Sequence, residues 1–168
     1  LVVRLSQFTP GESTAVGVRL QAGRNVIPAR THVSECRFNG PMKTGIELDG
    51  GCEFVELRQN IIDQPEVGIS LTGKDVDWKE LLIANTTFYE ATQAGIRISH
   101  TPKTGGIRGT QLAICRNVFA KVDGPELVFG AEFERERFDE MISTVEGAGI
   151  RDNWSDRPTE PDANAGEF

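Results

Sequence analysis

A degenerate repeat of roughly 24 to 31 residues constrains this chain more than any other feature of its sequence. Three copies are clear: FVELRQNII followed by VGISL, LLIANTTFYEATQAGIRI, and QLAICRNVFAKVDGPELVF. Each copy contains two alternating apolar residues, a small polar residue, a large apolar residue and a closing apolar pair. A period in this range predicts stacked supersecondary units, in which each unit packs on its neighbours instead of around one central core.

The repeat defines a register of equivalent positions. The anchor of each copy is the second apolar residue of its leading pair: Val3, Val33, Leu57, Ile83 and Ile114. The third residue after each anchor is small and mostly able to hydrogen bond: Ser6, Cys36, Asn60, Thr86 and Asn117. The fifth residue is large and apolar: Phe8, Phe38, Ile62, Phe88 and Phe119. We therefore expect a polar ladder at a tight turn and an internal apolar column beside it.

A short alternating segment closes each copy, at residues 18–20, 46–48, 69–71, 96–98 and 127–129. Glycine precedes the first four of these segments: Gly17, Gly45, Gly68 and Gly95. Alternation with a period of two over such short runs predicts strands and not helices. Glycine at this point predicts a corner where the backbone takes positive φ or approaches another segment closely. Each copy thus contains about three short strands separated by bends.

These patterns predict an all-β parallel β-helix of about five coils, stacked at a strand spacing of roughly 4.8 Å. The layout resembles the right-handed parallel β-helix of the pectate-lyase-like superfamily over residues 1 to about 130. The resemblance rests on the Gly-Ile-x-Leu strands, the turn residues Asn60 and Asn117, and the Phe/Ile column. A β-sandwich or jelly roll with regular turns is the alternative, but sandwiches do not keep one residue type in the same turn.

The pattern changes after residue 130, and we divide the chain there. Residues 131–149 are predicted to form a short capping helix, because Phe138, Met141, Ile142 and Val145 share one helical face. A solenoid needs such a cover over its terminal coil. Residues 150–168 are polar and rich in Pro and Asp, and are predicted to form a tail or linker.

Charge and cysteine content narrow the range of ligands. The net charge is −7 and no basic cluster occurs, which argues against nucleic-acid binding. No apolar run approaches the roughly 20 residues that a membrane-inserted helix needs. Cys36, Cys52 and Cys115 do not form a CxxC motif, so no metal site is predicted, and their redox state stays open. No cofactor is expected, except calcium if the ligand is an acidic polysaccharide.

The outward residues of the closing strands form the candidate binding row. These residues are Arg19, Glu47, Ser70 and Arg97, with Val128 in the same register. In enzymes of the fold that this chain resembles, the corresponding sheet often lines the substrate groove. The loops beside it, at 21–30, 49–54, 72–80 and 99–111, vary in length and contribute Trp78 as a further candidate, which either stacks on a sugar ring or anchors its loop.

Four residues are candidates for catalysis: Glu47, Asp49, Arg97 and His100. In an extended strand, Glu47 and Asp49 would lie on one face, roughly 6.6 Å apart along the chain. That spacing falls between those of retaining and inverting glycosidases. Resemblance to polysaccharide lyases implies an arginine base beside calcium. The alternatives are two solvated carboxylates, a ladder of charges that stabilises stacking, and a surface histidine, so enzyme activity stays open.

Two functions follow from this reading. The first is a carbohydrate module that recognises, and could process, a polysaccharide along the outward strand face and its loops, as a lyase or a glycoside hydrolase would. The second is a non-catalytic structural or adhesive module of a larger surface protein or assembly. Both place the chain outside the cell or at the cell surface. The open first coil is expected to dock further coils or subunits.

Overall fold

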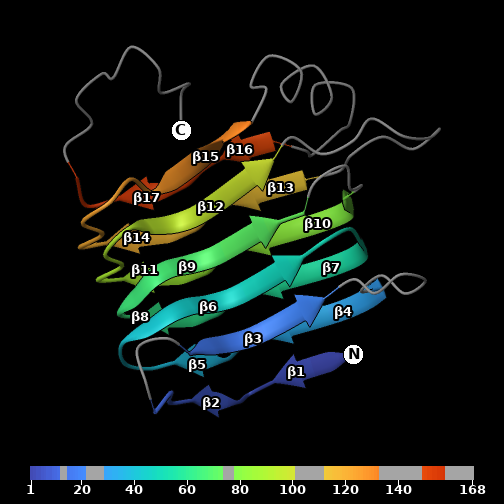
Figure 1. Ribbon diagram of the computed structural model, residues 1–168, viewed down its shortest axis with the longest axis horizontal. Coiled ribbons are helices and arrows are strands. Elements are labelled where there is room, and N and C mark those ends of the chain that lie inside the picture. The colour runs from blue at the N-terminus through green and yellow to red at the C-terminus, as the bar shows by residue number, and fades with distance from the viewer. Residues whose placement is uncertain (12–14, 22–28, 74–77, 101–111, 133–148, 158–168) are drawn as a thin grey trace.

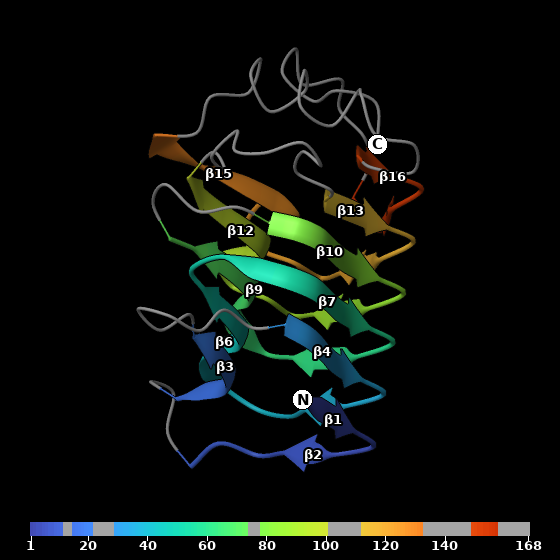
Figure 2. The same cartoon turned by 90° about the vertical axis from the view of Figure 1, so that its right-hand side faces the viewer.

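The computed structural model describes residues 1–11, 15–21, 29–73, 78–100, 112–132 and 149–157, with only the backbone of Ala29, His100 and Glu132. These residues form seventeen strands, all paired in parallel, in three sheets that wrap around one core (Figures 1 and 2). Successive strands fall in successive sheets, so each coil adds one strand to each sheet. The predicted all-β parallel β-helix is confirmed. None of the described residues belongs to a helix long and apolar enough to cross a membrane.

The three sheets are named here A, B and C, in the order in which the chain enters them. Sheet A contains β1 (Val2–Arg4), β4 (Ala29–Ser34), β7 (Cys52–Arg58), β10 (Trp78–Ala84), β13 (Leu112–Cys115) and β16 (Gly149–Arg151). Sheet B contains β2 (Gln7–Phe8), β5 (Arg37–Phe38), β8 (Ile61–Asp63), β11 (Thr87–Tyr89), β14 (Val118–Ala120) and β17 (Trp154–Ser155). Sheet C contains β3 (Val16–Gln21), β6 (Met42–Asp49), β9 (Pro65–Thr72), β12 (Ala94–His100) and β15 (Leu127–Glu132).

The predicted register is confirmed in sheet A. The anchor residues pair in sequence from Val3 through Val33, Leu57 and Ile83 to Ile114. The apolar column pairs in the same way in sheet B, from Phe8 to Phe119. Its aromatic members stack where they are adjacent, with ring centroids 4.8 Å apart for Phe8 and Phe38 and 4.9 Å apart for Phe88 and Phe119.

The polar ladder between sheets A and B is also confirmed. The side chain of Asn117 accepts a hydrogen bond from the backbone N–H of Thr86 (3.0 Å) and donates one to the carbonyl oxygen of Ile83 (3.1 Å). Asn60 does the same to Cys36 (3.1 Å) and Val33 (2.9 Å). Each asparagine therefore closes the turn of the coil before it.

The residue before each ladder position lies in the left-handed region of backbone space. These residues are Leu5, Glu35, Gln59, Asn85, Arg116 and Asp152, with φ between 50 and 56°. Non-glycine residues rarely adopt this conformation, and asparagine, aspartate and histidine are the residues enriched there. The short αL turn is what bends the chain sharply from sheet A into sheet B.

The four glycines that precede the closing segments allow close approach of neighbouring coils and do not serve positive φ. A Cβ atom at Gly17 would lie 2.5 Å from the Phe38 ring, and one at Gly45 would lie 2.5 Å from the Ile62 side chain. Gly68 and Gly95 face Phe88 and Phe119 in the same way. None of the four has a positive φ. Of the two reasons that the sequence offered for glycine at this corner, the structure supports the steric one.

Two more strands, β16 and β17, extend sheets A and B beyond the last predicted coil. They lie mainly in the segment that was predicted to be a polar tail. Strand β16 pairs with β13 through Ile150 and Ile114, and β17 pairs with β14 through Trp154 and Val118. The prediction that residues 150–168 form only a tail is therefore wrong for the part that includes these strands. The predicted capping helix falls mainly on residues 133–148, which lie outside the described residues.

Candidate functional site

The outward face of sheet C contains the candidate row in the predicted register. Arg19, Glu47, Ser70 and Arg97 occupy adjacent positions on β3, β6, β9 and β12, followed by Val128 on β15. We call these residues the central row. A second set, Gln21, Asp49 and Thr72, lies two residues further along the same strands, and we call it the lateral row. Sheet C forms one outer face of the solenoid (Figure 1).

A contact between neighbouring coils holds the first half of the central row in place. The Nε of Arg19 donates to Oε2 of Glu47 at 2.8 Å, and this pair leaves the Arg19 side chain half exposed while Glu47 is mostly covered. Ser70, the next residue in the row, is only 8% exposed. The first half of the row is thus a charge pair beside a nearly buried hydroxyl.

Arg97 differs from Arg19 in its partner. Its Nη2 donates to the amide oxygen of Gln93 at 3.1 Å, and the amide nitrogen of Gln93 donates in turn to Glu66 at 3.1 Å. Among the described residues, the guanidinium of Arg97 therefore has a neutral amide as its hydrogen-bond acceptor, where Arg19 has a carboxylate. The positive charge of Arg97 is accordingly less neutralised by direct contact.

The lateral row is organised in the same way. Asp49 accepts hydrogen bonds from the amide of Gln21 (3.2 Å) and from the hydroxyl of Thr72 (3.4 Å). One carboxylate thus connects three successive coils of sheet C. Each polar side chain of this row has a fixed neighbour before any ligand arrives.

The catalytic candidates do not meet at one point within the described part of the chain. Glu47 bonds to Arg19, Asp49 bonds to Gln21 and Thr72, and Arg97 bonds to Gln93. The side chain of His100 lies outside the described residues. Within those residues, no group of three or more His, Cys, Asp or Glu side chains is placed to hold a metal ion.

Trp78 cannot serve as a sugar-stacking residue. It begins β10, is 1% exposed, and donates its indole N–H to the carbonyl oxygen of Gly50 at 3.3 Å. A ring buried to this extent offers no face to a ligand from solvent. Its inclusion among the binding residues is therefore corrected, and the anchoring role that the sequence also allowed is the one observed.

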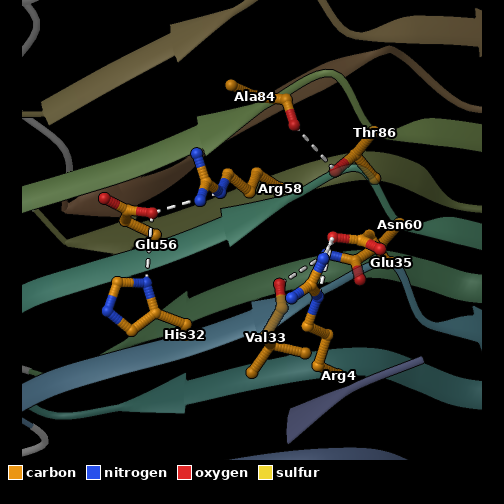
Figure 3. A network of polar contacts seen from close by, with 9 residues as sticks. All are labelled: Arg4, His32, Val33, Glu35, Glu56, Arg58, Asn60, Ala84 and Thr86. Atoms are coloured by element: carbon orange, nitrogen blue, oxygen red, sulfur yellow. Dashed lines mark hydrogen bonds and ion pairs between the residues drawn. The ribbon is translucent and has the colours of Figure 1, made fainter. Parts of the chain in front are cut away.

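Sheet A contains a polar cluster that was not predicted from the sequence. Nδ1 of His32 lies 3.1 Å from Oε2 of Glu56, and Nε of Arg58 lies 3.2 Å from the same oxygen (Figure 3). His32 and Glu56 each precede an anchor residue, Val33 and Leu57, so the register could have paired them. All three side chains are partly exposed, and the cluster links two coils on a side of the solenoid other than sheet C.

The cysteine thiols are all free and buried. Burial raises the pKa of the Cys52 thiol to about 12, so this thiol is protonated at neutral pH. Nucleophilic and metal-binding chemistry of cysteine requires the thiolate. Cys52 is thus part of the core and not of a site.

No known protein family, no curated protein and no solved structure matches this chain.

Proposed function

We propose that this chain is a β-solenoid module that recognises a polysaccharide through the outward face of sheet C. The observation that carries the proposal is the pair of polar rows, in which hydrogen bonds, most of them between coils, already orient the charged side chains. Orienting such groups in advance lowers the entropic cost of binding a ligand. The resemblance to pectate-lyase-like β-helices, where the corresponding sheet often lines the groove, supports the choice of this face.

The rows run across the strands, so a ligand chain would lie along the solenoid axis. Successive coils would then present equivalent polar groups at intervals of roughly 4.8 Å. Hydroxyl-rich chains suit such a surface because each hydroxyl can both donate and accept hydrogen bonds. Thr72 and the amide of Gln21 supply neutral partners, and Arg97 supplies a charged donor.

Binding can be tested with a panel of neutral and acidic polysaccharides, with and without calcium. We expect Arg97→Gln and Asp49→Asn to weaken binding to the same polysaccharide by about tenfold each, the loss expected for one hydrogen bond to a charged group. Glu56→Gln, on sheet A, is the matched control and should bind as the unaltered chain does. Equal loss in the control, or no binding to any polysaccharide, would contradict the proposal.

The second candidate function is a structural or adhesive module without a small ligand. It is favoured by the pairing of Arg19 with Glu47, because cross-strand charge pairs also stabilise stacked coils. The two functions differ in one measurement. If the rows serve only stacking, Asp49→Asn lowers the melting temperature and no polysaccharide raises it.

A further inference from the structure

Glycine directly follows an asparagine or an aspartate at three places in the chain: Asn39-Gly40, Asp49-Gly50 and Asp123-Gly124. At such a pair, the backbone nitrogen of glycine can attack the carbonyl carbon of the preceding side chain, because glycine has no side chain that hinders the approach. The attack requires a nitrogen that is free to give up its proton. The three pairs are similar in sequence but differ in their surroundings in the fold.

The two Asp-Gly pairs are held by neighbouring coils. The N–H of Gly50 donates to the carbonyl oxygen of Thr72 at 2.9 Å. Gly124 packs so closely on Gln93 that a Cβ atom at this glycine would lie 1.8 Å from the Gln93 carbonyl oxygen. A carboxylate is also a weaker electrophile than a carboxamide. Neither aspartate is therefore placed to react.

Gly40 is open where the other two glycines are held. Within the described part of the chain, its N–H donates no hydrogen bond, and nothing lies within 4 Å of its Cβ position. It has φ of 91° at the bend between β5 and β6. Asn39 is half-buried and Pro41 is exposed, so solvent reaches this bend.

The other described asparagines are protected by the stacking of the coils. In each case the N–H of the residue that follows the asparagine is bound to another coil, at 2.9 or 3.0 Å. These donors and their acceptors are Ile61 to Cys36, Thr86 to Asn117, Val118 to Thr86 and Trp154 to Asn117. A nitrogen whose proton is held in this way cannot attack, so the ladder asparagines keep their amides.

Arg37 contacts the amide that would be attacked at Asn39. Its Nε donates a hydrogen bond to Oδ1 of Asn39. Negative charge develops on this oxygen when a nucleophile adds to the carbon, and a guanidinium donor there stabilises it. Among the described asparagines, only Asn39 has a cationic donor on its side-chain oxygen.

We propose that Asn39 is a site of self-modification, at which the chain converts this asparagine to aspartate and isoaspartate. The nitrogen of Gly40 loses its proton and forms a bond to Cγ of Asn39, while the Cγ–Nδ2 bond breaks and the amide leaves as ammonia. The resulting succinimide takes up one water molecule, which is the only co-reactant. Opening at the bond between Cγ and the ring nitrogen gives aspartate, and opening at the main-chain carbonyl gives isoaspartate.

Both products change the bend that leads from sheet B into sheet C. Each places a carboxylate beside Arg37 and makes the net charge of −7 one unit more negative. Isoaspartate also adds one carbon atom to the main chain just before β6. Asn39 belongs to neither the central row nor the lateral row, so this inference and the proposed function can fail separately.

Peptide mapping by mass spectrometry tests the proposal on the folded 168-residue chain, held at mildly alkaline pH and sampled over time. Chromatography of the peptides separates isoaspartate from aspartate. We expect the peptide with Asn39 to convert at a rate no lower than in the same chain unfolded in urea. The peptides with Asn60, Asn117 and Asp49 should stay unchanged in the folded chain over the same time.

Three results would overturn the proposal. The first is conversion of Asn39 in urea but not in the folded chain, because the bend would then block the attack. The second is no conversion of Asn39 in either state. The third is conversion of Asp49 or of the ladder asparagines in the folded chain at a rate similar to that of Asn39.

The contribution of Arg37 has its own test. Arg37→Gln should slow conversion of Asn39 by about tenfold in the folded chain, the effect of one hydrogen bond to a charged group, and should leave the rate in urea unchanged. Arg116→Gln is the matched control, because Arg116 is exposed on another turn, where Gln59 adopts the same backbone conformation in an earlier coil. Equal rates in the two folded variants would overturn the contribution of Arg37.

Discussion

Asparagine and hydroxyl residues make different contacts at the ladder positions. Asn60 and Asn117 reach the backbone of the preceding coil with both ends of the amide. Thr86 and Ser6 instead donate to a carbonyl oxygen two residues earlier in their own turn, at 3.3 and 3.1 Å. Only asparagine, with a donor and an acceptor on one planar group, satisfies an N–H and a C=O of the neighbouring coil together.

Asn117→Ala should therefore destabilise the fold by about 2–4 kcal/mol, because it strands the buried N–H of Thr86 and the carbonyl oxygen of Ile83. Chemical denaturation measures this loss. Ser6→Ala, at a ladder position whose side chain bonds within its own turn, should cost less than about 1 kcal/mol. Similar losses in the two variants would contradict the distinction between the ladder residues.

Gly68 is predicted to tolerate no side chain. A Cβ atom there would lie 2.5 Å from the carbonyl oxygen of Gly95 and closer still to the ring of Phe88. Because backbone atoms of the next coil cannot move alone, we expect Gly68→Ala to cost about 2–4 kcal/mol, at or above the usual range for overpacking. Gly11→Ala is the control, since nothing lies within 4 Å of its Cβ position. A melting temperature unchanged in Gly68→Ala would refute the steric role.

At the scale of elements, periodicity located the sheets well because one register serves every coil. The αL column was not predictable, since Leu5, Glu35 and Gln59 are not residues that signal positive φ. The layer formed by β16 and β17 was missed although Ile150 and Asn153 repeat the anchor and ladder spacing. Its strands are short, and polar residues surround them, so the local pattern indicates a tail. Alternation along the strands predicted which residues of the central row face outward. It could not predict their hydrogen-bond partners, because these depend on distances between side chains of different segments.

The β16–β17 layer should contribute to stability through Ile150, which packs against the core, and through Asn153, which accepts from the backbone N–H of Asn117. We expect Ile150→Asp to lower the free energy of unfolding by about 1–3 kcal/mol, the cost of placing a charge in a partly buried apolar position. Hydrogen exchange should become faster in β13 and β14, which lose their outer partners.

Asp152→Asn is the matched control for this layer, because it keeps a residue suited to the αL turn. If hydrogen exchange in β13 is equally fast in Asp152→Asn, the loss of protection does not come from disrupting the β16–β17 layer.

At the scale of the whole molecule, the hydrophobic core runs along the solenoid axis as one continuous column, instead of lying at the centre of a globule. Each coil buries an anchor, a Phe or Ile and a closing apolar residue against the same residues of its neighbours. Stability in such a stack is approximately a sum of coil and interface contributions. The sequence could predict this architecture but not the state of its ends, because exposure of Leu5 or Trp154 depends on what lies next to each end.

The buried thiol of Cys52 should make the whole fold sensitive to alkali. The folded state holds this proton up to a pKa of about 12, while the unfolded chain releases it near the ordinary value of 9.0. The stabilisation is therefore complete below pH 9 and is lost as pH rises from 9 towards 12. Between pH 8 and 10, unaltered protein should lose about 1 kcal/mol more than Cys52→Ala, measured by denaturant titration. An equal loss in both would show that Cys52 does not titrate in this range.

The direction of the asparagine bonds has a consequence for how the chain is made. Each asparagine completes the turn of the coil that precedes it in sequence, so a coil leaving the ribosome waits for the next one to satisfy its backbone. At ordinary rates of synthesis, one repeat takes roughly 1 to 6 s to appear. Folding during synthesis would then proceed as a series of short delays, each ended by the arrival of a single amide. A translational pause between Thr86 and Asn117 would leave the newest turn open for longest.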